Sequence, residues 1–284
     1  MSRFRLTAKY PHKRAFITGA GSGLGLAFAH ALAGDGWTLG LTDINQQRLD
    51  ETIEAVKASG GNPSGYKFDV GNYEEFDFAV KQFVEKHGGI DIGINNAGIG
   101  CGGLFEEVSI ENFRKTIETD LMGVANGCHL FVPLMRKQGH AHILNVASAA
   151  AFVTAPRMSA YSTAKAGVVA LSECLRSELS DGNIVISVLC PTYFRTNIGK
   201  STIGSENEKK YSEMLADSSP ISAEEVAQVA LKSMAEEKLY IILPYDARFL
   251  WRLKRFMPER YWRLIKKIAE KEIERLEVKL KERP

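Results

Sequence analysis

Two large polar side chains stand one helical turn apart in the segment AYSTAKAG, which spans residues 160–167. If this segment is helical, Tyr161 and Lys165 lie on the same face of the helix. A neighbouring ammonium group lowers the pKa of a phenol from about 10 by about 1–3 units, towards the range in which it exchanges protons during catalysis. The alternative is a surface tyrosine and lysine with no chemical role, and this stretch alone does not distinguish the two.

A second stretch suited to chemistry is TGAGSGLG, residues 18–25, which follows an apolar run. Its spacing does not fit GxGxxG but fits TGxxxGxG, with Thr18, Gly19, Gly23 and Gly25. Glycines permit a tight turn and let a pyrophosphate approach the amides at a helix N-terminus, where the helix dipole favours anions. For the motif taken alone, a glycine-rich turn without a ligand is the alternative.

Asp43 ends the next apolar run, at the place where an acidic residue bonds the ribose hydroxyls in dinucleotide-binding folds. A carboxylate there disfavours the 2′-phosphate of NADP, and neither Ser22 nor Ile44 offers a compensating cation. The other interpretation of Asp43 is a cap for a helix that begins at Ile44 or Asn45. Together with the glycine turn, Asp43 predicts NAD as the cofactor, with NADP less favoured.

The elements that position these residues alternate along the chain. Short apolar runs predict strands at 14–18, 38–43, 65–70, 90–96, 142–147, 184–190 and 239–243. Helix-period patterns lie between them at 24–34, 45–59, 72–87, 109–137, 159–181 and 222–236. Strands that are apolar on both faces and alternate with helices form parallel sheets covered on each side. The sequence therefore predicts an α/β fold with a doubly wound parallel sheet of about seven strands.

Composition narrows the class of protein. The chain has 284 residues, a formal net charge of +2 and 25% charged residues, which argues against a nucleic-acid partner. Its four cysteines are widely spaced and form no CxxC pair, so we predict neither a disulfide framework nor a metal site. No signal peptide and no apolar run of about 18 residues is recognisable, which predicts a cytoplasmic protein.

Two regions differ in composition. We assign residues 1–245 to one NAD-binding domain, with the polar stretch 192–221 as its substrate loop. Residues 246–284 hold 13 Lys/Arg against 7 Asp/Glu and form a basic helical C-terminal extension.

Further motifs fall at the ends of predicted strands. NNAG (95–98) follows the fourth strand, Ser148 follows the fifth, and CPTYFRT (190–196) spans the end of the sixth. With TGxxxGxG and Tyr161-x-x-x-Lys165 in this order, residues 13–245 resemble the single-domain branch of the short-chain dehydrogenase/reductase family. The resemblance implies a Rossmann fold and hydride transfer to or from a nicotinamide.

The resemblance also implies roles for individual residues. Tyr161 would be the general acid/base, Lys165 would hold the nicotinamide ribose and bias Tyr161 towards phenolate, and Ser148 would bond the substrate oxygen. Asp69 matches an adenine contact and Asn95 a position beside the adenosine ribose, although structural roles for these two stay equally open. Thr196 matches a residue that bonds the carboxamide. The implied cofactor-binding residues are Gly19, Ser22, Gly23, Leu24, Gly25, Asp43, Asp69, Val70, Asn95, Ala97, Gly98, Tyr161, Lys165, Pro191 and Thr196.

Two positions depart from the family pattern. Thr192 stands where a glycine is usual after the proline, a mild change because no side chain acts there. Asp120, in ETDLMGV (118–124), stands where the family helix presents an asparagine that completes the catalytic set. A carboxylate near Lys165 would weaken the effect of that cation and raise the pKa of Tyr161.

The segment 247–267 combines eight Arg/Lys with five aromatic residues, and a helix is expected over about 259–282. Basic amphipathic helices with aromatic residues bind membrane surfaces. The alternative is that the aromatic residues pack on the end of the sheet or on a partner subunit while the arginines face solvent. The aromatic residues are Phe249, Trp251, Phe256, Tyr261 and Trp262.

These observations predict an NAD(P)-dependent oxidoreductase that acts on a small apolar alcohol or ketone and forms a dimer or tetramer. The residues expected to line the substrate pocket are mostly small or apolar, namely residues 99–105 with Phe152, Val153, Ala155, Pro156 and Met158. The alternatives are a catalytically impaired nucleotide-binding regulator and a peripheral membrane protein that uses residues 247–282.

Overall fold

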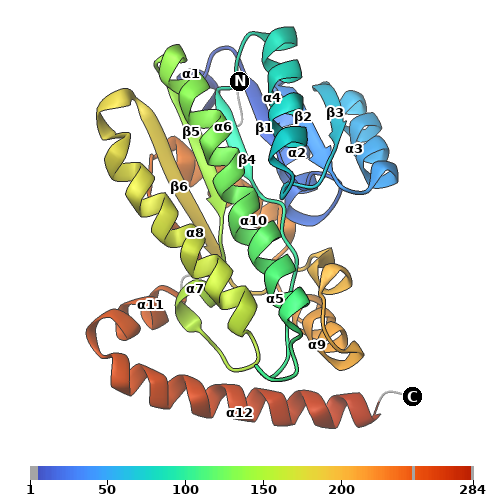
Figure 1. Cartoon of the computed structure of the whole chain (residues 1–284), viewed down its shortest axis with the longest axis vertical. Helices are drawn as coiled ribbons and strands as arrows, with labels where there is room; N and C mark the ends of the chain where they lie inside the picture. The colour runs from blue at the N-terminus through green and yellow to red at the C-terminus, as the bar shows by residue number, and fades with distance from the viewer. Residues whose placement is uncertain (1–5, 245–246, 283–284) are drawn as a thin grey trace.

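Seven parallel strands form one sheet at the centre of the computed structural model, which describes residues 6–244 and 247–282 (Figure 1). The strand order is β3-β2-β1-β4-β5-β6-β7. The chain moves outward from β1 to β3 and returns to β4 beside β1, so the direction of winding reverses between β1 and β4. The predicted doubly wound sheet is therefore confirmed. The strands are β1 (Arg14–Ile17), β2 (Thr38–Asp43), β3 (Asn62–Lys67), β4 (Ile92–Asn95), β5 (Ala141–Val146), β6 (Ile184–Pro191) and β7 (Tyr240–Leu243).

Both faces of the sheet are buried beneath helices, which explains why its strands are apolar throughout. In β1, Ala15 and Ile17 face one core while Phe16 faces the other. The first core is closed by α2 (Gly23–Ala33), α3 (Gln46–Ala58) and α10 (Ala223–Ala235), with the short α1 (Leu6–Lys9) at its edge. The second is closed by α4 (Tyr73–His87), α6 (Gly123–Gln138) and α8 (Ser159–Glu178).

Several predicted boundaries are wrong in informative ways. The third strand lies at Asn62–Lys67 instead of 65–70, because Asn62 pairs with the start of β2 while Phe68 and Val70 pack in the second core. The predicted helix 109–137 consists of α5 (Ile110–Ile117), a π-helical turn η1 (Glu118–Met122) and α6. The expected loop 192–221 contains a 3₁₀ turn η3 (Asn197–Ser201) and the helix α9 (Glu206–Asp217).

The C-terminal extension consists of α11 (Ala247–Phe256) and α12 (Pro258–Glu282). Helix α12 lies across one end of the molecule, beyond the short α7 (Ala150–Val153) that follows β5 (Figure 1). This is the end at which the strands terminate, so the extension shares it with the loops that follow each strand. The predicted domain boundary between residues 245 and 246 lies outside the described residues.

Candidate active site

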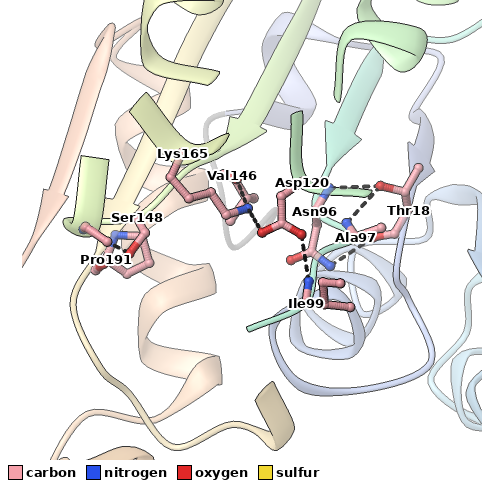
Figure 2. Close-up of polar contacts among 10 residues, drawn as sticks. Thr18, Asn96, Ala97, Ile99, Asp120, Val146, Ser148, Lys165 and Pro191 are labelled. Atoms are coloured by element: carbon pink, nitrogen blue, oxygen red, sulfur yellow. Dashed lines mark hydrogen bonds and ion pairs between the residues drawn. The ribbon is translucent and has the colours of Figure 1, made fainter. Parts of the chain in front are cut away.

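The turns after β1 and β4 are joined by a network of hydrogen bonds (Figure 2). The Thr18 hydroxyl accepts from the backbone N–H groups of Asn96 (2.9 Å) and Ala97 (3.0 Å). The Asn96 amide Nδ2 donates in return to the carbonyls of Thr18 (2.9 Å) and Gly19 (3.1 Å). Asn96 was not among the residues singled out from the sequence, although it is the second asparagine of the NNAG motif.

The glycine turn has a shape that only glycine allows. Gly19 and Gly23 have φ angles of +64° and +53°. A Cβ on Gly25 would lie 2.1 Å from the carbonyl oxygen of Gly19. The Ser22 side chain makes no capping hydrogen bond to α2, whereas α3 and α4 are capped by Asn45 and Asn72. The first amides of α2 therefore fit an anion such as a pyrophosphate.

Asp43 lies beside this turn and does not cap α3 through its side chain. Its Oδ2 accepts from the N–H of Gly21 (3.0 Å) and its Oδ1 from the N–H of Asn45 (2.9 Å). Asn45 is the residue that caps α3. A Cβ on Gly21 would lie 2.7 Å from Asp43 Oδ2 and 2.9 Å from Arg48 Cβ. The Cβ of the exposed Arg48 therefore lies close to the glycine turn, and the sequence analysis did not predict a cation at this place.

Asp69 and Asn95 occupy different surroundings. Asp69 accepts from the N–H of Gly71 (3.0 Å) and pairs with Lys115 (2.7 Å) near the end of β3. Burial raises the pKa of Asp69, but the contacts with Lys115 and Gly71 outweigh burial and lower it below its usual value. Asn95 is buried and its Nδ2 donates to Asn145 Oδ1 (2.9 Å). The structural role left open for Asn95 is the one the geometry supports, because its side chain links β4 to β5.

Ser148, Tyr161 and Lys165 come together at the carboxyl end of the sheet. The Ser148 Oγ donates to the carbonyl of Pro191 (3.4 Å) and accepts from the N–H of Ala150 (3.2 Å), and its side chain lies close enough to Tyr161 to affect the pKa of the phenol. Tyr161 and Lys165 lie one turn apart near the start of α8, with Lys165 Nζ 5.6 Å from the centre of the tyrosine ring. Lys165 is only 3% exposed, and its Nζ donates to the carbonyl of Val146 (3.2 Å).

Asp120 faces this group from the π-helical turn η1 (Figure 2). It is fully buried, its Oδ1 accepts from the N–H of Ile99 (2.8 Å), and its Oδ2 lies 3.2 Å from Lys165 Nζ. A Cβ on Gly98 would lie 3.3 Å from that Nζ, so the turn after β4 also reaches the pair. The sequence-based expectation of a carboxylate near Lys165 is met by this geometry.

The pKa of Tyr161 is raised above its ordinary value, chiefly by burial and then by the charge of Asp120. The polar side chain of Ser148 acts in the opposite direction and lowers the pKa of Tyr161. Our expectation that the lysine lowers this pKa is therefore wrong for the structure as it stands. The first reason is that the phenol is buried, and the second is that Asp120 faces it and pairs with the ammonium group of Lys165. Burial also raises the pKa of Asp120, against the opposing influence of Lys165 and the Ile99 N–H.

An apolar cluster surrounds the Tyr161 ring. The residues in and against it come from the loop after β4, from α5, from α7, from the start of α8 and from the segment after β6. An ion pair between Arg157 and the buried Glu208 joins the loop before α8 to α9. The backbones of Cys101 and Ile203 form an isolated β-bridge. Pro191 ends β6 and Thr196 precedes η3 on the same side. The cluster comprises Cys101, Ala150, Ala160 and Tyr161, with Val108, Phe113, Met158 and Ile203 packed against it.

The C-terminal helices adjoin this site. The buried Tyr261 donates from its hydroxyl to the carbonyls of Phe152 (3.1 Å) and Val153 (2.7 Å) in α7. Trp251 packs on Tyr240 of β7, with ring centres 5.2 Å apart. The other three aromatic residues of the segment, Phe249, Phe256 and Trp262, are exposed. Within residues 6–244 and 247–282, no helix is long and apolar enough to cross a membrane, and no cluster of metal-ligating side chains occurs.

Comparison with known proteins agrees with this geometry. The sequence profile of the family described as short chain dehydrogenase matches residues 13–207. A solved short-chain dehydrogenase/reductase from Burkholderia phymatum, in complex with NAD, superposes with a TM-score of 0.82 at 31% identity, over 86% of this chain and 92% of that one.

Two curated relatives add to this. The chain is 30% identical over 233 residues to the 3-oxoacyl-acyl-carrier-protein reductase FabG of Thermotoga maritima, covering 81% of this chain and 93% of FabG. It is 36% identical over 187 residues to the probable oxidoreductase EphD of Mycobacterium tuberculosis, covering 66% of this chain. The match spans only 32% of EphD, so the chain corresponds to about a third of that relative.

Proposed function

The chain belongs to the short-chain dehydrogenase/reductase family, and we propose that it is an NAD(P)-dependent oxidoreductase that interconverts an apolar alcohol and its ketone. The observation that carries the proposal is the convergence of Ser148, Tyr161 and Lys165 near the turn after β4, which is itself bonded to the glycine turn through Asn96. The apolar cluster around Tyr161 supports an apolar substrate.

The residues present fit a dinucleotide. The first amides of α2 and the tight turn formed by Gly19, Gly23 and Gly25 suit a pyrophosphate, and the Asp43 carboxylate beside Gly21 suits ribose hydroxyls. When bound, the nicotinamide supplies the acceptor or donor of the hydride. We propose NAD over NADP because the Asp43 carboxylate repels a 2′-phosphate.

The side chains of the chain manage the proton and the orientation of the substrate. In alcohol oxidation, Tyr161 accepts the hydroxyl proton at its phenolic oxygen, and in ketone reduction it returns that proton. Ser148, whose side chain lies close to Tyr161, positions the substrate oxygen. Lys165 places a buried positive charge beside both, shared with Asp120.

A specific observation favours a second candidate, a nucleotide-binding protein with impaired catalysis. The Asp120–Lys165 ion pair and the raised pKa of Tyr161 both oppose formation of the phenolate. The two candidates differ in turnover but share cofactor binding, so one set of measurements separates them.

The test is NADH production or consumption with a panel of secondary alcohols and ketones, together with NADH affinity measured by fluorescence. Loss of the Tyr161 hydroxyl in Tyr161→Phe should lower kcat by about 10²–10⁴-fold with little change in affinity. Tyr66→Phe, which removes a hydroxyl from β3, is the matched control and should retain turnover. Binding without turnover in the unmutated protein would favour the impaired candidate, and unchanged turnover in Tyr161→Phe would contradict the proposed role.

A further inference from the structure

Helix α11 has two apolar faces, of which only one is buried. Ala247 and Trp251, four residues apart, face the body of the protein, where Trp251 packs on Tyr240. Phe249, Leu253 and Phe256 have the spacing i, i+4, i+7 and therefore lie together on the opposite side. Phe249 is 65% and Phe256 76% exposed. Two phenylalanines this exposed on one stripe are typical of an interaction surface.

Positive charge borders this stripe. Arg248, Arg252 and Arg255 repeat the spacing i, i+4, i+7 one position before Phe249, Leu253 and Phe256, so they form a parallel row on the same helix. The sequence of α11, ARFLWRLKRF, contains four basic residues and no acidic one. Arg252 and Arg255 are exposed, and neither forms an ion pair with the residues that the structure describes.

We propose that this face of α11, made of Phe249, Leu253 and Phe256 with Arg252 and Arg255, binds the surface of an anionic lipid bilayer. The aromatic side chains enter the boundary between headgroups and acyl chains, and the arginines pair with lipid phosphates. Helix α11 lies in the plane of the bilayer and does not cross it. The docking does not depend on the proposed enzymatic function.

Charge complementarity favours a lipid surface over a second copy of this chain. A two-fold contact through this face would bring the arginine row of one α11 close to that of the other, which is a repulsive arrangement. An anionic lipid surface offers acyl chains to the apolar stripe and phosphates to the arginine row.

The attachment of the extension gives the docked protein a defined orientation. Tyr261, near the start of α12, is held by the carbonyls of Phe152 and Val153 in α7, which follows Ser148 closely in the chain. Helix α11 also packs on β7 through Trp251. Docking through α11 therefore brings the end of the molecule that carries α7 near the bilayer (Figure 1).

Co-sedimentation of the full chain with vesicles tests the proposal. We expect binding to vesicles of phosphatidylcholine mixed with phosphatidylglycerol, no binding to phosphatidylcholine alone, and weaker binding as salt is raised. Phe249→Ser combined with Phe256→Ser should lower the partition coefficient by at least about tenfold. Arg252→Gln and Arg255→Gln should each lower it by about fivefold.

Matched controls remove similar groups elsewhere. Phe78→Ser with Val229→Ser removes two exposed apolar side chains from α4 and α10, and Arg136→Gln with Lys137→Gln removes two exposed charges from the end of α6. Both control proteins should bind vesicles as the unmutated chain does, and circular dichroism verifies that all variants are folded. Absence of binding to anionic vesicles at low salt would overturn the proposal, as would equal binding by the α11 variants. A dimer that is lost in the phenylalanine variant, without vesicle binding, would assign the face to self-association instead.

Discussion

At the scale of single residues, the ion pair between Asp120 and Lys165 is the feature that most affects the proposed chemistry. Both groups are buried and 3.2 Å apart, and the charge of Asp120 raises the pKa of Tyr161. A carboxylate at this position raises the pKa of the phenol, whereas an amide would leave the charge of Lys165 unopposed. This residue therefore sets the pH range in which the tyrosine acts as a base.

Asp120→Asn should lower the pKa of Tyr161 and move the pH–rate profile of alcohol oxidation to lower pH by about one unit. The amide oxygen keeps an acceptor for the Ile99 N–H, so the fold and the affinity for NAD should be almost unchanged. The measurement is kcat for oxidation as a function of pH. Glu118→Gln, which removes an exposed charge from the same turn, is the control and should leave the profile in place. An unshifted profile in an active Asp120→Asn protein would show that the pair does not control Tyr161.

The proposed preference for NAD is also expected to depend on individual side chains, Asp43 and Arg48. Asp43→Asn removes the charge but keeps an acceptor for the Gly21 N–H, and should narrow the preference for NADH over NADPH by about tenfold. Arg48→Gln removes the cation whose stem lies beside Gly21, and should widen the preference. Dissociation constants for both cofactors check this, and equal constants in the unmutated protein would refute the assignment.

At the scale of elements, a single irregular turn decides where Asp120 points. The helical stretch from α5 to α6 is interrupted by η1, which buries both Thr119 and Asp120. π-Helical turns recur at functional sites because the extra residue re-aims a side chain. Helical periodicity in the sequence does not reveal an extra residue within one turn. The prediction of one continuous helix over 109–137 therefore missed η1.

Helix α6 approaches β4 closely because Gly127 has no side chain. A Cβ on Gly127 would lie 2.0 Å from Asn95 Oδ1, and would displace the amide that donates to Asn145. Gly127→Ala should therefore lower the free energy of unfolding by about 1–3 kcal/mol, measured by urea denaturation. Gly34→Ala is the control, because its Cβ would meet nothing closer than 3.8 Å at a helical φ of −61°, and should change stability by less than about 1 kcal/mol. Equal stabilities of the two variants would contradict this packing.

At the scale of the whole molecule, the two ends of the sheet carry different kinds of polar residues. The side chains proposed to be catalytic lie where the strands end, and two further buried polar links lie where the strands begin. There Arg14 pairs with Asp91 at 2.8 Å, and His142 lies between Tyr10 (3.3 Å) and Ser187 (2.8 Å). The residues at the amino end are therefore expected to govern stability without touching the substrate.

His142 should make the whole fold sensitive to acid. Its pKa is lowered to about 3, first by burial and then by nearby positive charges, so the folded protein keeps it neutral. The unfolded chain binds a proton at this residue below about pH 6.5, and the folded chain does so only near pH 3. As pH falls through this window, the free energy of unfolding should decrease by about 1.4 kcal/mol per unit from this residue.

Urea denaturation at pH values across this window tests the dependence on His142. The slope of the unfolding free energy against pH should become shallower in His142→Gln, even though that variant is less stable at neutral pH. His30→Gln, which replaces an exposed histidine, should keep the original slope. An unchanged slope in His142→Gln would assign the acid sensitivity to other groups.

The sequence by itself determined the parallel sheet, the glycine turn and the pairing of Tyr161 with Lys165. These features follow from patterns within one element or one turn, in which neighbouring residues fix each other's geometry. Apolar strands alternating with helices have few ways to bury both faces of a sheet, so the fold followed from the pattern.

Only the tertiary structure decided which distant groups meet. The bonds from Asn96 to the glycine turn and the position of Arg48 beside Gly21 each join residues from different elements. A carboxylate near Lys165 was expected from the family resemblance, but its burial and its distance from Lys165 were not. Such contacts depend on strand register, on the turn η1 and on how closely helices approach the sheet. The raised pKa of Tyr161 follows from the same cause, because burial and the facing carboxylate are set by packing and not by local sequence.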